Sequence, residues 1–362
     1  MSAGLRSVSF MSMMITVASL PTNVSLPTKS PAPVFSDDDV KKCIRIKTPE
    51  LITSGPLTGS GRHWHVIATC CEGGHVEDDA KVIMATSSDD GKTWGKTQFL
   101  AEGKPAHGPN GIYDKIKDRL LVQYNSPDDS KTYQIISSDH GHSWSKPVDL
   151  SHQLKDCGHT GETAGSRIQT STGRLLWYGG GSDHGKYRSC FWYSDDHGET
   201  YQTNAVKSIE NEVSFSMVDH GGGGFIYANG RSINPDWKPY RIDYVSRDDG
   251  KTWGKSKSAL KDPATEVERS LVYGDGVLYT ASPKGTKDGP RMELIVSCSK
   301  DNGHTWPHSV NLGGDHYAGY SSLGYMGTHD RTLIVVWDHD RDDKYNPGGA
   351  PLFQIIDTKW CA

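Results

Sequence analysis

Short runs in which apolar and polar residues alternate recur along the chain and predict β-strands. Five of these runs read KVIMATS, TYQIIS, RSCFWYS, YRIDYVS and MELIVSCS, and they are rich in Val, Ile, Tyr and Phe. A period of two places successive side chains on opposite faces of a strand. Long stretches with helical periodicity are hard to find, so the pattern predicts an all-β protein.

Each of these runs leads into the same short motif, Ser-x-Asp-x-Gly-x-Thr/Ser-aromatic. The five copies begin at intervals of 50, 57, 52 and 53 residues and lie at Ser87–Trp94, Ser137–Trp144, Ser194–Tyr201, Ser246–Trp253 and Ser299–Trp306. In such a turn the Asp accepts backbone N–H bonds, the Gly adopts a backbone angle that other residues resist, and the aromatic ring packs underneath. Because the motif recurs throughout the chain, we interpret it as structural rather than catalytic.

The period of the repeat predicts a β-propeller. A repeat of 50–57 residues fits one four-stranded antiparallel blade. Five marked blades and one unmarked blade give a six-bladed β-propeller. We expect the unmarked blade to join the two ends of the chain, with LFQIID near the C-terminus paired to an N-terminal strand. This closure removes the exposed sheet edges.

Composition narrows the class of protein further. The chain has 362 residues, a net charge of −5 and no basic bias, which argues against a nucleic-acid partner. Residues 1–40 combine an apolar run, interrupted by serines, with a Pro- and Ser-rich stretch that contains the sequon Asn23-Val24-Ser25. We interpret residues 1–40 as a secretory signal or flexible segment and residues 41–362 as the propeller. A secreted or extracellular location is therefore expected, with the cytoplasm as the alternative, and no segment is long enough to predict a membrane span.

Seven cysteines occur without metal-ligand spacing. We interpret them as small buried apolar residues, which leaves the compartment open. Cys70 and Cys71 are adjacent, so on one strand they would point to opposite faces.

The five turns resemble the Asp-boxes of sialidases (neuraminidases), and further motifs of that family occur in the family's order. The match covers roughly residues 43–357 and includes CIRIKTPELI, NEVSFSMVDHGGGGFIYANGR, RMELIVSCSKDNGHTW and GYSSL. In these motifs the resemblance assigns site roles to Arg45, Glu212, Arg231, Arg291 and Tyr320. One departure is Lys47, which stands where the family has proline after Arg-Ile.

The chemistry of a sialoside suits these residue types. Its anomeric carbon carries a carboxylate, which Arg45, Arg231 and Arg291 would bind through charge-assisted hydrogen bonds. That carboxylate would repel an acidic nucleophile, whereas a neutral phenol can attack once a base takes its proton. The resemblance therefore implies Tyr320 as nucleophile and Glu212 as its base. Glu210, two residues away, would share a strand face with Glu212.

The family has two further acidic residues in its site, a general acid and a residue that orients the first arginine. The family places its general acid on a loop before the first Asp-box, and here CCEGGHVEDDAKVIMATS offers Asp78 and Asp79, with Glu77 as a third candidate. The family also has an acidic residue, usually Glu, that orients the first arginine. In this chain LIVVWDHD provides Asp338 at that place.

The resemblance thus implies a retaining exo-α-sialidase that removes terminal sialic acids from glycoproteins, glycolipids or oligosaccharides without a metal or organic cofactor. Transfer to another sugar, the sialic acid type (N-acetyl or deaminated), the linkage preference and the oligomeric state stay open. One alternative is a propeller that binds sialosides without cleaving them. A second, ranked below it, is a polysaccharide lyase that would use histidines such as His63, His65, His75 and His107 with a tyrosine.

Overall fold

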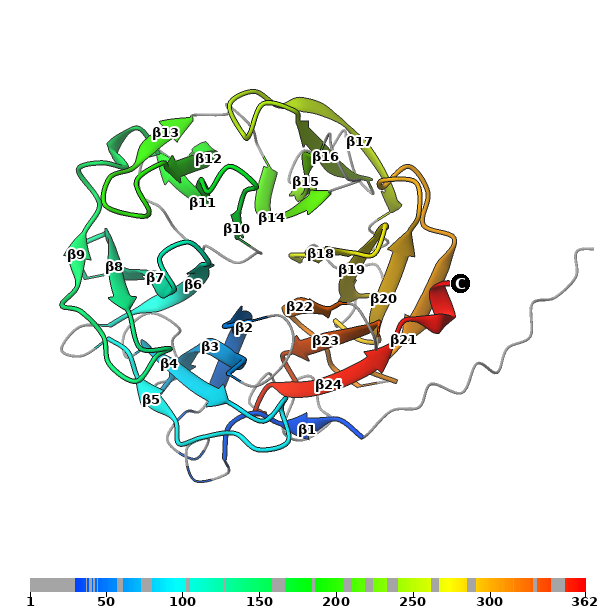
Figure 1. Cartoon of the computed structure of the whole chain (residues 1–362), viewed down its shortest axis with the longest axis horizontal. Coiled ribbons are helices and arrows are strands. Elements are labelled where there is room, and N and C mark those ends of the chain that lie inside the picture. The colour runs from blue at the N-terminus through cyan, green and yellow to red at the C-terminus, as the bar shows by residue number, and fades with distance from the viewer. Residues whose placement is uncertain are drawn as a thin grey trace, which may run out of the picture.

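Six antiparallel sheets, each of four strands, are arranged around a central axis in the computed structural model of the chain (Figure 1). The structure describes residues 30–36, 38, 41, 43, 45–56, 61–72, 80–101, 105–126, 128–157, 167–183, 186–204, 210–218, 224–232, 240–261, 267–284, 291–314, 316–327, 331–339 and 349–362. The predicted fold class, an all-β six-bladed propeller with four-stranded blades, is confirmed. None of the helices in these residues is long and apolar enough to cross a bilayer.

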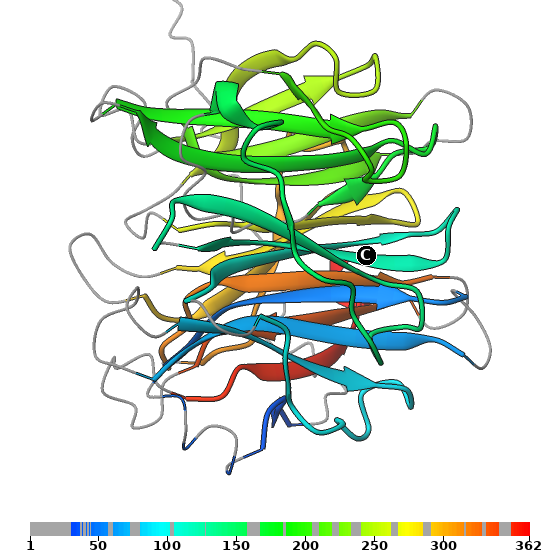
Figure 2. The same cartoon turned by 90° about the vertical axis from the view of Figure 1, so that its left-hand side faces the viewer.

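Within each of the first five blades the chain runs outward from the axis, strand by strand. The first blade consists of β2 (Arg45–Ser54), β3 (His63–Cys71), β4 (Ala80–Ser87) and β5 (Gln98–Phe99), and the second of β6 (His107–Asp114), β7 (Arg119–Ser126), β8 (Lys131–Ser137) and β9 (Val148–Asp149). The third consists of β10 (Ile168–Gln169), β11 (Leu175–Asp183), β12 (Lys186–Ser194) and β13 (Gln202–Asn204), and the fourth of β14 (Glu210–Val218), β15 (Phe225–Ser232), β16 (Tyr240–Ser246) and β17 (Gly254–Lys261). The fifth consists of β18 (Ser270–Gly274), β19 (Val277–Pro283), β20 (Leu294–Ser299) and β21 (His308–Asn311). The side view shows these strands running from one face of the ring toward the other (Figure 2).

The sixth blade contains strands from both ends of the described chain. It consists of β22 (Ser321–Met326), β23 (Thr332–Trp337), β24 (Leu352–Asp357) and β1 (Ala32–Pro33), and β1 pairs with β24 (Figure 1). Val34 and Phe35 follow β1 and are buried in the core. The closure predicted for LFQIID is therefore present. The propeller extends back to residue 32, inside the segment 1–40 that was interpreted as a signal or flexible segment, because these apolar residues complete the last blade.

The five Asp-box turns share one hydrogen-bond pattern. In the first, Ser87 Oγ donates to Asp89 Oδ1 at 2.8 Å, Gly91 N donates to Ser87 Oγ at 2.8 Å, and Thr93 donates to both oxygens of Asp89. The same contacts recur around Asp139, Asp196, Asp248 and Asp301. Gly91 has φ +72°, a conformation that side chains resist. Trp94 packs edge-on against Phe353 of the sixth blade, so the structural interpretation of the turns agrees with the contacts.

Six of the seven cysteines form disulfides, so our interpretation of them as small apolar residues is wrong for these six. The bonds are Cys43–Cys70, Cys157–Cys190 and Cys298–Cys361, and Cys71 stays free and buried. The sequence could not reveal the pairing because the partners lie 27, 33 and 63 residues apart and meet only in the folded sheets. The expectation that Cys70 and Cys71 point to opposite faces is consistent with only Cys70 being bonded.

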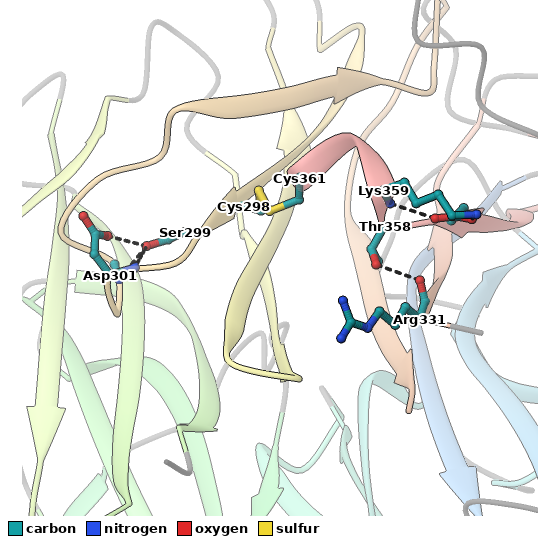
Figure 3. The surroundings of a disulfide bond; sticks show 9 residues. Cys298, Ser299, Asp301, Arg331, Thr358, Lys359 and Cys361 are labelled. Carbon is teal, nitrogen blue, oxygen red and sulfur yellow. Dashed lines mark hydrogen bonds and ion pairs between the residues drawn. A yellow bond between two sulfur atoms is a disulfide. The ribbon is translucent and has the colours of Figure 1, made fainter. Parts of the chain in front are cut away.

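The last disulfide fastens the end of the described chain to the neighbouring blade. Cys361 belongs to the short helix η3 (Lys359–Cys361), and Cys298 lies on β20 of the fifth blade (Figure 3). Beside it, Thr358 Oγ1 donates to the Arg331 carbonyl at 2.7 Å. The disulfide therefore connects the fifth and sixth blades.

Removing this disulfide should destabilise the propeller measurably. We expect Cys298→Ala combined with Cys361→Ala to lower the free energy of unfolding by about 2–4 kcal/mol, because the bond restricts a long segment of the unfolded chain. Urea titrations with and without reductant test this. The difference between wild type and variant should shrink once reductant opens the bond in the wild type. A difference of the same size in reductant would mean that lost packing, not the bond, caused it.

Candidate active site

The residues that the resemblance assigns to the site lie at or near strand ends on one face of the ring. Arg45 is the first residue of β2, Glu212 is the third of β14, and Tyr320 directly precedes β22. Arg231 lies near the end of β15 and pairs with Asn211 at the start of β14. Because the inner strands all begin at the same end of the axis, residues from three blades converge there.

Tyr320, Glu212 and Arg231 form a continuous chain of polar contacts. Tyr320 Oη donates to Glu212 Oε1 at 2.5 Å, and Arg231 Nη1 donates to Glu212 Oε2 at 3.1 Å. The Glu212 carboxylate is fully buried, whereas the Arg231 side chain is 19% exposed. A buried carboxylate with one phenol and one guanidinium as partners is suited to accept the phenolic proton.

The backbone of β14 is distorted at Glu212. A register shift between Asn211 and Ser214 interrupts the pairing with β15, and Glu212 has φ +49°. A bulge of this kind turns a side chain away from the regular alternation, and a non-glycine residue in this conformation costs roughly 1–3 kcal/mol. The distortion brings Glu212 to Tyr320. Of Glu210 the structure describes only the backbone, which pairs with Ser232, so its side chain lies outside the described part.

Arg291 lies against Tyr320 from the fifth blade. Its guanidinium carbon is 5.3 Å from the centroid of the Tyr320 ring, within the range of a cation–π contact. The Arg291 carbonyl accepts a hydrogen bond from Ala318 N at 3.2 Å. Arg291 and Arg231 therefore approach the Tyr320–Glu212 pair from neighbouring blades.

Asp338 supports the backbone of Tyr320. Asp338 N donates to the Tyr320 carbonyl at 2.9 Å, and Tyr320 N donates to Asp338 Oδ2 at 3.3 Å. Asp338 is only 1% exposed, and this burial raises its pKa to about 7, against the opposing effects of the Tyr320 N–H and of Arg45, Arg291 and Lys47. Arg45 Nε and Asp338 Oδ1 are both buried without a hydrogen-bond partner. Asp338 would therefore orient Arg45 through the attraction between their charges, not through a hydrogen bond between these two atoms.

The raised pKa of Asp338 predicts a pH-dependent stability. The Asp338 carboxyl group has a pKa of 3.8 in the unfolded chain and about 7 in the folded protein. Its contribution to the free energy of unfolding is therefore fully present below pH 3.8 and is lost as the pH rises through about 7. We expect wild-type stability to fall by on the order of a few kcal/mol more than that of Asp338→Asn between about pH 4 and pH 8.

Chemical denaturation across this range checks the Asp338 prediction. Other buried acids, such as Asp243, also have raised pKa values, so only the difference between the two proteins reports on Asp338. Parallel stability curves for wild type and Asp338→Asn would contradict the prediction.

A second layer of buried charge lies next to the Tyr320–Glu212 pair and was not found from the sequence. Ser214 Oγ donates to Glu268 Oε1 at 2.9 Å. Burial, then the carboxylates of Glu50 and Glu212, hold the pKa of Glu268 well above its usual range. Burial lowers the pKa of Arg167 to about 10, although Glu50 opposes the shift. No motif marks these residues, because each comes from a different blade.

An open cavity of about 800 Å³ follows the axis along the later halves of the inner strands. Its lining includes Glu50, Arg167, Gly111, Phe215 and Tyr325. Gly111, Phe215 and Tyr325 lie farther along their strands from the Arg45 end, whereas Glu50 and Arg167 belong to the layer of buried charge beside Glu268. The cavity thus begins at that layer and opens away from the candidate catalytic residues.

The remaining predicted residues divide into two groups. Asp78, Asp79 and Glu77, the candidates for the general acid, and His75 lie outside the described residues. His63 and His65 pair with Ser54 and Ile52 at the far end of β2 from Arg45, whereas His107 begins β6. This placement separates two of the four lyase histidines from Tyr320. Within the described ranges, no group of three or more His, Cys, Asp or Glu side chains forms a metal site.

Comparisons with known proteins give one family and one recurrent fold. The family model described as BNR repeat-like domain matches residues 66–329. No curated protein matches the chain. Among solved structures, the Hadza microbial sialidase Hz136 is 20% identical with a TM-score of 0.75, covering 91% of this chain and 68% of its own.

Two further solved structures show the same arrangement. Trypanosoma rangeli sialidase is 19% identical with a TM-score of 0.65, and the match covers 91% of this chain and 58% of that protein. The NanB sialidase from Streptococcus pneumoniae is 12% identical with a TM-score of 0.72, covering 91% and 71%. The chain therefore spans only part of the length of these proteins, and at such identities the likeness concerns the fold.

Proposed function

The chain belongs to the BNR repeat-like family and has the propeller fold found in sialidases, and from this premise we propose that it is a retaining exo-α-sialidase acting on sialylated glycoproteins, glycolipids or oligosaccharides. The observation that carries the proposal is the 2.5 Å hydrogen bond from Tyr320 Oη to the buried Glu212 carboxylate, which Arg231 also contacts. A phenol bonded to a buried base, beside arginines, suits attack on a sugar that carries a carboxylate at its anomeric carbon.

In the proposed reaction the substrate carboxylate binds to Arg45, Arg231 and Arg291. Glu212 takes the phenolic proton while Tyr320 Oη forms a bond to the anomeric carbon, and the glycosidic bond breaks. An acid of the loop before the first Asp-box, Asp78 or Asp79, gives its proton to the departing sugar oxygen. That loop acid then takes a proton from water, which attacks the anomeric carbon, and Tyr320 leaves and recovers its proton from Glu212. Two displacements at one carbon give net retention.

The decisive test is release of product from a sialoside. Purified protein is incubated with a methylumbelliferyl sialoside and with its deaminated analogue, fluorescence is followed, and the first-formed anomer is identified by NMR. Release with the α anomer formed first supports the proposal. No release from either substrate, with retained binding of sialoside, would instead favour a sialic-acid-binding propeller.

The same assay separates hydrolysis from transfer. Solved structures of similar fold include intramolecular trans-sialidases from leech and Ruminococcus gnavus, so the product of this chain needs direct identification. Free sialic acid supports the hydrolase. An anhydro sugar, or a sialylated acceptor, as the product would show that the same residues catalyse transfer and not hydrolysis.

We also propose that the protein folds in an oxidising compartment, consistent with a secreted or extracellular location. The support is the pairing of six cysteines into three disulfides, because such bonds persist mainly outside reducing compartments. Mass spectrometry of alkylated protein isolated from its native source tests this. Six alkylated cysteines from these pairs would contradict the proposal.

A further inference from the structure

The strained backbone at Glu212 needs support from outside its own strand. Glu212 has φ +49°, and the pairing of β14 with β15 shifts between Asn211 and Ser214. A non-glycine residue keeps such a conformation only where the surrounding structure holds it. Ser214 is the first residue after the shift to pair again, opposite Asn229, so the position of Ser214 sets where the bulge ends.

Glu268 holds Ser214 from the fifth blade. Ser214 Oγ donates a hydrogen bond to Glu268 Oε1 at 2.9 Å, and the two residues are 0% and 1% exposed. Glu268 lies two residues before β18, the inner strand of its blade. Because both residues are buried, loss of one partner would leave the polar group of the other unsatisfied. The bond therefore fixes the end of the bulge to the neighbouring blade.

The residue before Glu268 packs against the candidate nucleophile. Val267 is fully buried and forms a two-residue apolar cluster with Tyr320. The Tyr320 hydroxyl in turn donates to Glu212 Oε1 at 2.5 Å. Val267 therefore contacts the phenol side of this pair. Glu268 supports the carboxylate side, through Ser214.

The segment that contains Val267 and Glu268 is itself held by Arg241. Arg241 lies on β16 of the fourth blade and is fully buried. Its Nη1 donates to the Val267 carbonyl at 2.9 Å, and its Nε donates to Asn229 Oδ1. Asn229 is the residue that pairs with Ser214 across β14 and β15. The contacts therefore form a closed circuit between two blades, so that a shift of Ser214 would disturb Val267 as well.

The Glu268 carboxyl group can accept this bond without adding a negative charge beside Glu212. Burial first, and then the carboxylates of Glu50 and Glu212, raise the pKa of Glu268 well above its usual range, although the Ser214 bond and Arg241 oppose the shift. A protonated carboxyl group still accepts a hydrogen bond through its carbonyl oxygen. The amide of glutamine offers the same oxygen, which provides an isosteric variant for testing.

We propose that Glu268 is a positioning residue for the candidate base, because the hydrogen bond that it accepts from Ser214 holds the β14 bulge in the conformation that directs Glu212 to Tyr320. The proposal rests on the proposed function, since it takes Glu212 as the base that accepts the phenolic proton. Glu268 itself takes no part in bond-making or in binding the substrate carboxylate. Its loss should therefore reduce turnover and leave affinity unchanged.

Ser214→Ala tests this role in turnover, because it removes the donor and leaves all charged groups in place. We expect kcat for a methylumbelliferyl sialoside to fall about 10- to 100-fold, since a small misplacement of a catalytic group can have an effect of that size. The dissociation constant of an unsaturated sialic acid analogue, measured by calorimetry, should stay within about twofold of wild type. In a Tyr320→Phe background, Ser214→Ala should reduce turnover no further, because it acts through Tyr320 and its base.

Two variants of Glu268 separate the hydrogen bond from side-chain volume and charge. Glu268→Gln keeps an acceptor oxygen and should retain kcat within about twofold. Glu268→Met has a similar volume without that oxygen and should lose kcat as Ser214→Ala does. If Ser214→Ala does not fold, the comparison of these two variants decides between the outcomes.

Ser216→Ala is the matched control for loss of a buried hydroxyl. Ser216 lies two residues further along β14, is 5% exposed and lines the axial cavity. We expect Ser216→Ala to leave kcat and the affinity for the analogue unchanged. Thermal melting of each variant confirms that it is folded.

A spectroscopic measurement follows the Tyr320–Glu212 bond without requiring turnover. In protein isotopically labelled at the Cζ of tyrosine, the Tyr320 resonance is identified by its loss in Tyr320→Phe. We expect Ser214→Ala and Glu268→Met to shift this resonance, because the shift of Cζ responds to the hydrogen bond of the phenol. Glu268→Gln and Ser216→Ala should leave the resonance in place.

The outcomes distinguish this inference from the proposed function. If the wild type does not turn over sialosides but the resonance shifts in Ser214→Ala and Glu268→Met alone, hydrolysis is wrong and the positioning role stands. If the wild type turns over sialosides and Ser214→Ala keeps kcat within about twofold, the positioning role alone is wrong. A loss of kcat in Glu268→Gln as large as that in Glu268→Met, or an unmoved resonance in both Ser214→Ala and Glu268→Met, also overturns it.

Discussion

Tyr320→Phe is expected to reduce turnover by roughly 10³-fold or more, because it removes the oxygen that forms the covalent bond to the anomeric carbon in the first step of the proposed reaction. The change deletes the hydroxyl that donates to Glu212 at 2.5 Å. It keeps the ring beneath the Arg291 guanidinium. The fold and the arginines should therefore persist, and an unsaturated sialic acid analogue should still bind.

Paired measurements on the folded variant test this expectation. Calorimetric titration reports binding, and the release of methylumbelliferone reports turnover. Tyr124→Phe, which removes a hydroxyl from a buried tyrosine on β7 of the second blade, provides the matched control. Near-full turnover by Tyr320→Phe would remove the nucleophile assignment and, with it, the mechanism placed on these residues.

Arg231→Ala is expected to weaken binding, turnover and stability together. Loss of one charge-assisted contact to the substrate should cost about 1.5–3 kcal/mol of binding. The fully buried Glu212 carboxylate would also lose its ion pair, and an uncompensated buried charge typically costs about 3–5 kcal/mol of folding free energy. This variant thus differs from Tyr320→Phe, which should lose turnover but keep ligand binding.

Arg231→Lys sharpens the comparison. It keeps a positive charge near Glu212 but lacks the planar fork of donors that fits a carboxylate. We expect it to recover much of the stability and less of the binding. Urea titrations and calorimetry provide the two readings. Wild-type binding by Arg231→Ala would show that this arginine does not contact the ligand.

The sequence predicted the features that depend on local or repeated patterns. The five turns are recognisable because each of their residues has its own role in the hydrogen-bonding pattern, as Asp89 and Gly91 illustrate. The repeat length then leads to six blades, and the apolar run at Leu352–Asp357 marks the closing strand. The pairing of an N-terminal strand with this strand was expected, but the position of β1 was not, since Ala32–Pro33 is only two residues long and lies in a Pro-rich stretch that resembles a linker.

Within the site, the residues that belong to recognisable sequence motifs could be predicted, but the buried residues that contact them could not. Tyr320, Glu212 and Arg231 occur in recognisable sequence contexts, and the structure brings them into contact. Glu268 has no such context, because its partner Ser214 lies on another blade. The disulfides escaped for the same reason. Pairings between distant parts of a chain depend on register and blade order, which no local pattern contains.

The pairing of Ala32 with Phe353 also sets the order in which the molecule can be assembled on the ribosome. At typical rates of about 5–20 residues per second, β1 emerges on the order of tens of seconds before its partner strand. During that interval the earlier blades form an incomplete ring with exposed strand edges, which are prone to associate with other chains. Ring closure is therefore a late event in synthesis, and the nascent protein is most vulnerable to aggregation just before it.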